Sequence, residues 1–422
     1  MNKEENKRFA LESDQNDLLA NFRNQYHIPL HNGKPCIYLC GNSLGLQPKT
    51  VREHIEKELL HWEKYGVEGH FMGNDPWVSY HESFSPLLAP LIGAKEIEVV
   101  AMNQLTVNLH LMMVSFYRPT TKKYKILMEA SAFPSDQYAV ESQVKFHGFD
   151  ENAIIEVKPN NGVLISTESI CNSILENKDE FALVLLSGVN YYTGQVFDIE
   201  TIAKLCKEHD ILIGVDLAHA IGNIPMQLHN WDIDFATWCS YKYLNSGPGG
   251  VSGIFIHEKY AQDKTLPRFA GWWGHDAASR FKMQKGFIPQ AGAEGWQLSN
   301  APVLSMAAHK AALLLFQQAG LKNLRAKSLA LTDFCIQLLN EINEEKKEVL
   351  FQIITPLNKN ERGSQLSIVA MHNGRKIFEE LSKRGVICDW REPDVIRIAP
   401  VPMYNTFEDV YNFINILKEI IE

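Results

Sequence analysis

The stretches ILIGVDLAHA (211–220) and FATWCSYKYLNSGPGG (235–250) decide the fold that the sequence predicts. Each begins with a short apolar run of the length expected for a buried parallel strand. Asp216 ends the first run, and Lys242 follows closely after the second. Because the carboxyl ends of parallel strands meet at one rim of a sheet, the two charged side chains should emerge near each other. The sequence therefore predicts an α/β fold with a ligand site at that rim.

Similar apolar runs of strand length occur upstream, at residues 125–130, 153–157 and 181–186. Helix-like stretches separate several of them, and the segment 200–210 is one such crossover. Helical periodicity also marks 51–66 and 106–118, the second opened by Thr106 as a candidate N-cap. This alternation predicts a mostly parallel central sheet covered by helices.

The pattern of apolar and polar residues changes near residue 301, where a smaller α+β unit should begin. Two long helical patterns, 303–320 and 321–343, resemble a bridge out of the large domain. The remaining strand and helix patterns lie at 365–371, 375–385, 395–400 and 407–421. We expect an N-terminal segment (1–50) that packs with the small domain, a large domain (51–300) and a bridging and small C-terminal unit (301–422).

The bulk composition is that of an ordinary globular protein. Of the 422 residues, 45% are hydrophobic and 22% charged, and the formal net charge of -9 gives no reason to bind nucleic acid or an anionic membrane. The N-terminus shows neither a signal nor a transit peptide, and no apolar run is long enough to span a bilayer. We therefore expect a cytoplasmic protein whose partners are small molecules and a second copy of itself.

The seven cysteines are odd in number and include no CxxC pair, so neither a disulfide framework nor a zinc site is predicted. Cys36 and Cys40 are the nearest to a redox or metal pair. Apolar packing is the interpretation that we favour for them.

Lys242 and Asp216 together suggest a definite chemistry. A lysine at the rim can form an imine with an aldehyde cofactor, and an aspartate can pair with the ring nitrogen and keep it protonated. The protonated ring would then accept electrons. From these two residues alone a structural salt bridge remains an alternative, because charged strand ends are common in α/β proteins.

Other side chains suit a phosphorylated aromatic aldehyde, although each has a structural alternative. Thr106 at a helix start could hold a phosphate, or could only cap the helix. Phe133 could stack on a pyridine ring, and Asp136 could add charge near its nitrogen; core packing and a helix cap are the alternatives. Tyr241 could bind phosphate or pass a proton. The glycines of 246–253 fit neither nucleotide motif and indicate a flexible turn.

With these residues in place, the chain resembles the fold-type I pyridoxal-phosphate enzymes of the aminotransferase class V group. Further strings narrow the resemblance to the kynureninase family, and they run in family order along nearly the whole chain. They are YLCGNSLGLQPK (38–49), NQLTVNLHLMM (103–113), SAFPSDQYA (131–139), GWWGH (271–275), RFKM (280–283), QLSN (297–300) and IRIAPVPMYN (396–405).

The resemblance implies a role for individual residues. Lys242 would be the Schiff-base lysine and Asp216 the partner of the pyridine nitrogen, while Phe133 would stack on the ring. The remaining cofactor-site residues that it implies are Leu105, Thr106, Pro134, Ser135, Asp136, Ser187, His219, Tyr241, Trp272 and Asn300. Trp272 and Asn300 would reach the site across a homodimer interface.

For the substrate, the resemblance implies that Arg397 clasps the α-carboxylate, a task that suits a planar guanidinium. A surface or interdomain ion pair is the alternative for this arginine. Ser43, His70 and Asn300 match positions that shape the aromatic end of the substrate pocket. A histidine and an amide there could bind the phenol of 3-hydroxykynurenine, so we expect that substrate to be used at least as well as kynurenine.

The activity implied is hydrolytic Cβ–Cγ cleavage of L-kynurenine and 3-hydroxy-L-kynurenine to anthranilate or 3-hydroxyanthranilate and L-alanine, with pyridoxal 5'-phosphate as cofactor. Lys242 would be both anchor and base, and Tyr241 the proton donor to the released β-carbon. The role would lie in tryptophan catabolism or NAD biosynthesis. The alternatives are another class V enzyme, such as a cysteine desulfurase, and a non-catalytic binding protein of the same fold.

Overall fold

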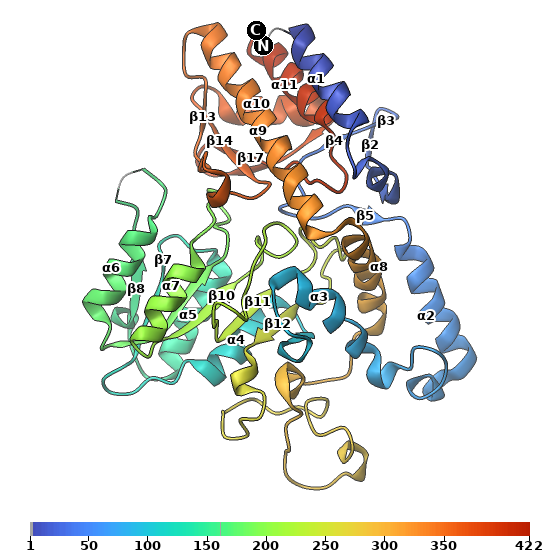
Figure 1. The fold of residues 1–422 in the computed structure, drawn as a ribbon, viewed down its shortest axis with the longest axis vertical. Helices are drawn as coiled ribbons and strands as arrows, with labels where there is room; N and C mark the ends of the chain where they lie inside the picture. Colours follow the sequence, from blue (N-terminus) through green and yellow to red (C-terminus); the bar gives the residue numbers. More distant parts are fainter. Residues whose placement is uncertain (1–2, 161) are drawn as a thin grey trace.

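A seven-stranded sheet forms the centre of the large domain in the computed structural model, which describes residues 3–160 and 162–422 (Figure 1). The strand order is β6-β12-β11-β10-β9-β7-β8, and β12 alone runs against the others. In that order the strands span Val99–Ala101, Gly253–Ile256, Phe235–Trp238, Leu212–Asp216, Phe181–Ser187, Lys125–Glu129 and Ile154–Val157. The predicted mostly parallel sheet is thus confirmed. Strands β7, β8, β10 and β11 lie within the predicted apolar runs and β9 ends one residue beyond its run, whereas β6 and β12 match none of these runs.

Side chains alternate between the two faces of the sheet, and each face has its own helices. Ile126 and Met128 of β7 pack in one hydrophobic cluster, together with residues of α4 and α5, whereas Leu127 packs in another, together with residues of α6 and α7. The four covering helices are α4 (Leu105–Phe116), α5 (Pro134–Phe146), α6 (Thr167–Asn177) and α7 (Ile199–Glu208). The sheet is therefore buried on both sides, which explains why its strands are continuously apolar.

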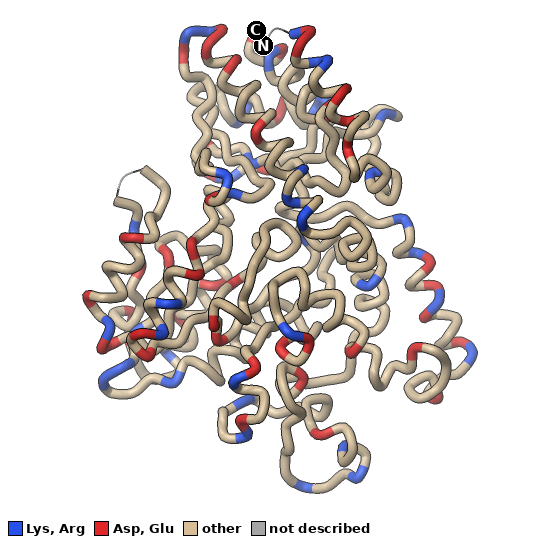
Figure 2. The backbone as a smooth tube through the Cα atoms, viewed as in Figure 1, with Lys and Arg blue, Asp and Glu red and all other residues tan. Residues whose placement is uncertain are grey.

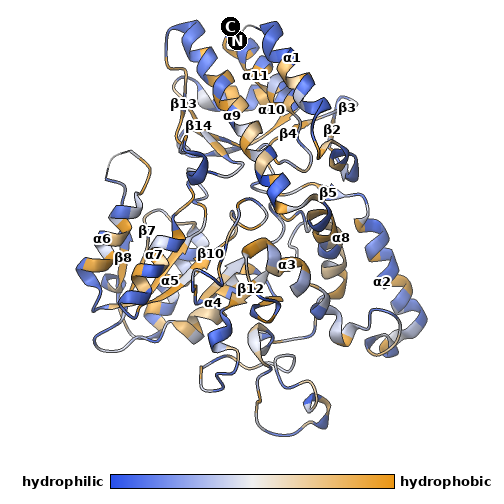
Figure 3. Ribbon diagram, viewed as in Figure 1, coloured by the Kyte–Doolittle hydropathy of each residue, from blue (hydrophilic) through white to orange (hydrophobic). Residues whose placement is uncertain are grey.

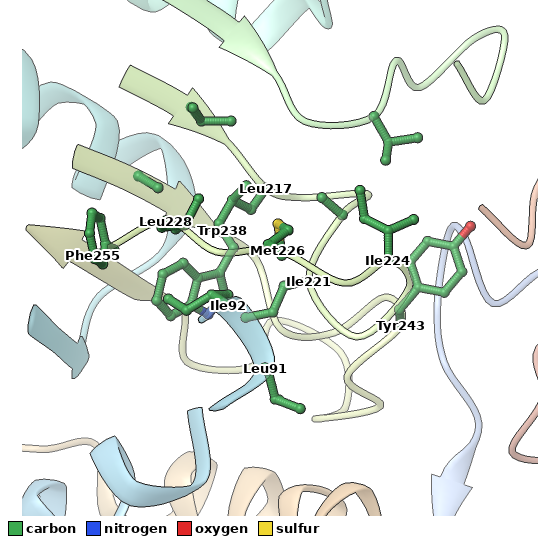
Figure 4. Close-up of a cluster of buried hydrophobic side chains, with 14 of the residues drawn as sticks. Leu91, Ile92, Leu217, Ile221, Ile224, Met226, Leu228, Trp238, Tyr243 and Phe255 are labelled. Atoms are coloured by element: carbon green, nitrogen blue, oxygen red, sulfur yellow. The ribbon is translucent and has the colours of Figure 1, made fainter. Parts of the chain in front are cut away.

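The register of the sheet aligns polar side chains at its carboxyl edge. Asp216 at the end of β10 lies opposite Ser187 at the end of β9, and Glu129 ends β7, the next strand along. Beneath this edge a buried cluster includes Leu217 and Tyr243, the neighbours of Asp216 and Lys242 in the chain (Figure 4). Reactive and core side chains thus follow each other directly, so the core fixes the backbone from which the reactive groups project.

The small domain contains a four-stranded antiparallel sheet in the order β13-β14-β17-β16. These strands span Phe351–Ile353, Leu366–Ala370, Val395–Ile398 and Asp389–Arg391. Four helices pack on it or on each other: α9 (Leu321–Lys346), α10 (Gly374–Lys383), α11 (Phe407–Ile421) and α1 (Lys3–Gln15). Blue and red residues are interspersed along α1 and α9 (Figure 2), and the outer helices carry both hydrophilic and hydrophobic colours (Figure 3), as expected for amphipathic helices.

Segments from both ends of the chain join the two domains. Helix α8 (Val303–Ala319) packs against α2 (Val51–Tyr65) and α3 (Ser85–Ile92), and α9 continues from it into the small domain. The N-terminal segment adds short strands in three pairs: β1 (Tyr26–His27) with β5 (Gln47–Pro48), β2 (Leu30–His31) with β3 (Lys34–Pro35), and β4 (Ile37–Tyr38) with β15 (Val386–Ile387). The two termini consequently lie side by side at the top of Figure 1.

The loop between β4 and β5 reaches the large domain at the Lys242 turn. Gly45 donates its backbone N–H to the carbonyl of Tyr241 at 2.8 Å, and a Cβ on Gly45 would lie 2.4 Å from the carbonyl oxygen of Lys242. Only glycine permits so close an approach.

A long, mostly irregular segment after β12 projects from the large domain (yellow to gold in Figure 1). It carries exposed apolar side chains at Phe269, Trp272, Phe281, Met283 and Ile288. As for membranes, each helix within 3–160 and 162–422 lacks the length or the apolarity needed to cross one.

Candidate functional site

A cavity of about 270 Å³ opens at the carboxyl edge of the central sheet, beside the ends of β7, β9, β10 and β11. It lies at the rim where the sequence predicts a ligand site. The predicted site residues that line it are Leu105, Thr106, Phe133, Ser135, Asp136, Ser187, Asp216, His219, Tyr241 and Lys242. Ten side chains from five separate stretches of sequence therefore meet in one place.

Lys242 lies in the turn that follows β11, and its side chain is almost fully buried. Its Nζ is 5.7 Å from the centroid of the Phe133 ring and 5.8 Å from that of Tyr241. The turn is held by hydrogen bonds from Asn245 N to the Lys242 carbonyl (3.0 Å) and from Ser246 N to the Ser240 carbonyl (3.2 Å). The amine is thus presented to the cavity by a backbone that is already fixed.

Three carboxyl groups gather near the amine with few cations to balance them. Asp216 accepts a hydrogen bond from Ala218 N at 2.7 Å and shares another with Asp136, whose Oδ1 is buried without a partner. Glu129 accepts hydrogen bonds from the backbone N and the Oγ of Ser187. Burial raises the pKa of all three carboxyls, and the charges of Asp216 and Glu129 raise that of Asp136 further. This end of the cavity would stabilise a positively charged N–H group.

Two helix starts also line the cavity. Thr106 lies in the first turn of α4 and Ser135 in the first turn of α5, and their hydroxyl oxygens are 2.7 Å apart. Free backbone N–H groups and the helix dipoles favour an anion there. The prediction that Thr106 caps its helix is wrong. The N-cap is Gln104, whose backbone is extended and which makes no side-chain cap bond, so the Thr106 hydroxyl is left free to bond with Ser135.

Aromatic rings also line the cavity. Phe133 is 42% exposed despite its size, and Tyr191 meets it edge to face at 5.2 Å. Burial, together with the charges of Lys242, Arg397 and Arg391, holds the pKa of His219 well below its ordinary value, so this imidazole is neutral. Burial and the adjacent Cys239, which is hydrogen-bonded to Tyr241, raise the pKa of the Tyr241 phenol, so its proton is retained.

These features match a flat, phosphorylated pyridine aldehyde such as pyridoxal phosphate. The buried, unpartnered Oδ1 of Asp136 and the neighbouring Asp216 suit a ring N–H, the hydroxyls at the helix starts suit a phosphate, and Lys242 suits the aldehyde. The open face of Phe133 suits the ring.

The other predicted site residues lie outside the cavity. Pro134 begins α5 but does not line it. Ser43 is half-buried in the loop that touches the Lys242 turn, and His70 packs edge to face on Trp77 with its Nδ1 3.1 Å from the Val67 carbonyl oxygen. Trp272, 47% exposed, and Asn300 lie on the surface of the projecting segment. Within one chain, the structure does not bring these residues together with the cavity.

Arg397 is fully buried in β17 and pairs with Asp389 on the adjacent strand β16. Its Nη1 also donates to the backbone carbonyl of Tyr191, which belongs to the large domain. The ion pair is buried within the small-domain sheet, so it is not the surface or interdomain pair considered as the alternative, and the contact that reaches the large domain is the hydrogen bond to Tyr191.

Sequence reasoning missed several residues that line the cavity, notably Glu129, Tyr191 and Cys239. Glu129 ends the apolar run 125–130, just as Asp216 ends its own run, so the same reasoning applied to β7 could have found it. Cys239 lies three residues before Lys242, but the spacing of the cysteines gives no reason to single it out. For Tyr191, which lies in a loop four residues after β9, no pattern in the sequence predicts the position.

Comparison with known proteins identifies relatives over almost the entire length. A family model described as the kynureninase C-terminal domain matches residues 324–417, and one for O-phosphoseryl-tRNA(Sec) selenium transferase matches 84–230. A kynureninase of Flavobacterium psychrophilum is 52% identical over 413 residues, which cover 97% of both chains. The kynureninase of Koribacter versatilis is 51% identical, and the alignment covers 96% of both chains. The kynureninase of Mus musculus is 46% identical, and the alignment covers 98% of this chain and 93% of its own length.

Solved structures show the same fold at much lower identity. A cysteine desulfurase of Thermococcus onnurineus aligns with a TM-score of 0.75 over 91% of this chain and 94% of its own, at 16% identity. A cysteine desulfurase of Escherichia coli aligns with the same TM-score and identity over 95% of this chain and 98% of its own. At such identity the likeness concerns the fold alone, which confirms the predicted fold class.

Proposed function

The chain belongs to the kynureninase family, and from that premise we propose that Lys242 binds the aldehyde of pyridoxal 5'-phosphate while Asp216 pairs with its ring nitrogen. The protein is a pyridoxal-phosphate-dependent hydrolase with kynureninase function. The observation that carries the residue assignment is that Lys242 and Asp216 line one cavity that also holds further carboxyls and the hydroxyls at two helix starts.

The reaction is hydrolytic cleavage of the Cβ–Cγ bond of L-kynurenine to anthranilate and L-alanine, and we propose that the 3-hydroxylated substrate is cleaved likewise to 3-hydroxyanthranilate. The cofactor, when bound, supplies an electron sink for the bond changes at the substrate's α-carbon. Tryptophan catabolism is the corresponding pathway.

The residues around the cavity divide the proton transfers. Lys242 would be the base that takes the α-proton of the substrate, since among the described residues that line the cavity it is the only one with an amine. Tyr241, whose phenol keeps its proton because burial raises its pKa, donates to the released β-carbon. His219 is neutral and so offers hydrogen bonds without adding charge. Leu105, Thr106, Pro134, Ser135, Asp136 and Ser187 complete the cofactor site.

Substrate recognition draws on residues outside the cavity. Arg397 binds the α-carboxylate, because it is an arginine held beside the Tyr191 loop. Ser43, His70 and Asn300 shape the aromatic end, where His70 and Asn300 can bind a 3-hydroxyl group. The hydroxylated substrate should therefore be used at least as well as kynurenine.

A homodimer would bring the distant residues to the site. Phe71 contacts Phe281 at 5.7 Å and Phe281 contacts Trp272 at 5.4 Å, and all three rings are about half exposed. Such a continuous apolar surface is typical of an interface between subunits. Trp272 and Asn300 would then complete the partner's cavity. The seven cysteines are free thiols, as a cytoplasmic location would favour.

The two alternative functions make different demands on the chain. A cysteine desulfurase needs an exposed nucleophilic thiol, but Cys335 is fully buried in α9 and burial raises its pKa to about 12. A non-catalytic binding protein of this fold would not need the amine that faces the cavity.

Turnover tests the assignment directly. The purified protein, supplied with pyridoxal phosphate, should release fluorescent anthranilate from L-kynurenine and 3-hydroxyanthranilate from 3-hydroxy-L-kynurenine. Failure with both substrates would refute the proposed function, and sulfide release from cysteine in the same assay would favour the desulfurase alternative.

A further inference from the structure

Arg397 is held by one edge of its guanidinium group. Nε donates to Asp389 Oδ1 at 2.7 Å and Nη2 donates to Asp389 Oδ2, so the aspartate grips the side of the group in a bidentate pair. Nη1 donates to the Tyr191 carbonyl. A guanidinium has five N–H donors, so two of them, one on each Nη, have no acceptor among the residues that the structure describes.

Asp389 is also shared with a second arginine. Arg391 Nη2 lies 3.5 Å from Asp389 Oδ2, and its Nε is buried with no hydrogen-bond partner. Two cations therefore face one carboxylate, and Arg391, whose side chain is 37% exposed, keeps part of its hydration. Asp389 balances the buried charge of Arg397, so the positive charge in excess lies on the more exposed arginine.

This cluster lies against the cofactor cavity. The ring of Tyr191 lines the cavity and packs on Phe133, while the carbonyl of the same residue accepts from Arg397. The charges of both arginines also reach the buried His219 in the cavity wall. An anion held by Arg397 would thus lie close to the proposed site of reaction.

The bond between Arg397 and the Tyr191 carbonyl can be exchanged without leaving a buried acceptor unsatisfied. The Tyr191 carbonyl also accepts from Gln365 Nε2 at 2.9 Å, so it keeps one partner if Nη1 turns to another anion. Asp389 holds Arg397 with both of its carboxylate oxygens, and Arg391 lies beside one of them. Because Arg397 is only 1% exposed, we expect an incoming carboxylate to reach its Nη1 by taking the place of the Tyr191 carbonyl.

We propose that Asp389 is a positioning residue for substrate binding: it holds one edge of Arg397 so that the other edge can exchange the Tyr191 carbonyl for the α-carboxylate of an amino acid. Arg391 supplies the second positive charge that the carboxylate balances. The inference rests on the proposed role of Arg397.

The alternative is that Asp389 is a resident anion which the substrate must displace. The two roles predict opposite changes in Asp389→Asn. A positioning role predicts that KM for L-kynurenine rises about 10- to 100-fold while kcat changes less than about threefold, because a misplaced guanidinium weakens binding without touching the reacting atoms. A displaced anion predicts that KM falls.

A double-mutant cycle shows whether Asp389 acts through Arg397. In an Arg397→Lys background, Asp389→Asn should lower kcat/KM by less than about twofold, because the bidentate grip is already gone. The control Asp394→Asn removes an exposed carboxylate from the same hairpin and should leave both kinetic constants unchanged. A fall or no change in KM for Asp389→Asn, or additive losses in the cycle, would overturn the proposal.

Binding of L-alanine to the holoenzyme provides a readout that does not depend on turnover. Its affinity, followed by the absorbance of the bound cofactor, should weaken about 10-fold or more in Asp389→Asn and partly recover in Asp389→Glu, which restores the charge. Unchanged cofactor absorbance and thermal unfolding establish that each variant is folded. The inference would be overturned if wild type and Asp389→Asn bound L-alanine with equal affinity. A wild-type protein that binds L-alanine but does not cleave kynurenine would contradict only the proposed function.

Discussion

The cofactor-facing and substrate-facing parts of the site are built in different ways. The cavity residues follow the ends of neighbouring strands or open the helices after them, so a single domain of one chain brings them together. Ser43, His70, Asn300 and Arg397 come from four segments outside the cavity. The difference teaches that the proposed cofactor site is a local property of the sheet edge, whereas the proposed substrate site depends on how distant segments, and in the proposed dimer two subunits, pack.

Lys242→Ala should have the largest effect on turnover of all the changes in the cofactor-facing part. Without the amine, both the covalent anchor and the base are lost, and we expect turnover to fall by at least about 10³-fold. The substrate-facing residues remain in place, so the protein should keep its fold and assembly. Steady-state kinetics with circular dichroism checks this, with Lys310→Ala as a matched control outside the cavity; normal turnover in Lys242→Ala would contradict the assignment.

Asp216→Asn should have the next largest effect. An amide cannot stabilise a positively charged ring N–H, so we expect kcat to fall by roughly 10²- to 10³-fold while KM changes little. Kinetics at saturating cofactor measures this. A variant that binds substrate more weakly but retains kcat would indicate that Asp216 acts on the substrate and not on the cofactor.

The cofactor-facing part was also the more predictable from sequence. Asp216 and Lys242 end or follow apolar runs, and such local signals survive because parallel strands share one edge. The position of Tyr191 depends on a loop held by the small domain, and the pairing of Asp389 with Arg397 depends on the register of an antiparallel sheet. Packing between distant segments decides these features, and no local pattern records it. Thr106 shows the same limit on a small scale, since the helix begins one residue before it.

Phe281→Glu tests whether the substrate-facing part depends on a second subunit. A charge in the apolar surface formed with Phe71 and Trp272 should weaken dimerisation by about 30-fold, or roughly 2 kcal/mol. Sedimentation should show a shift toward monomer together with lower kcat/KM, and a matched change at Phe146, which is exposed elsewhere, should do neither. A Phe281→Glu protein with unaltered assembly and activity would refute this interface.

The smallest effect is expected for Glu129→Gln in cofactor-free protein. Burial raises the pKa of Glu129 above its ordinary value of 4.5, so folding is favoured when this carboxyl is protonated. This contribution to stability is fully present below pH 4.5 and is lost as the pH rises through the pKa of the folded state. The glutamine variant escapes this loss and should be more stable than wild type by about 1 kcal/mol at pH 8. Urea unfolding at pH 5 and pH 8 measures it; a difference that is larger at pH 5 would contradict the sign.

Borohydride reduction followed by peptide mapping tests the central claim most directly. Protein loaded with pyridoxal phosphate should lose its cofactor absorbance on reduction and carry the phosphopyridoxyl mass on the peptide that contains Lys242, at about one group per chain. Reduction that labels a different lysine, or no lysine, would contradict the proposal that the amine at this sheet edge holds the cofactor.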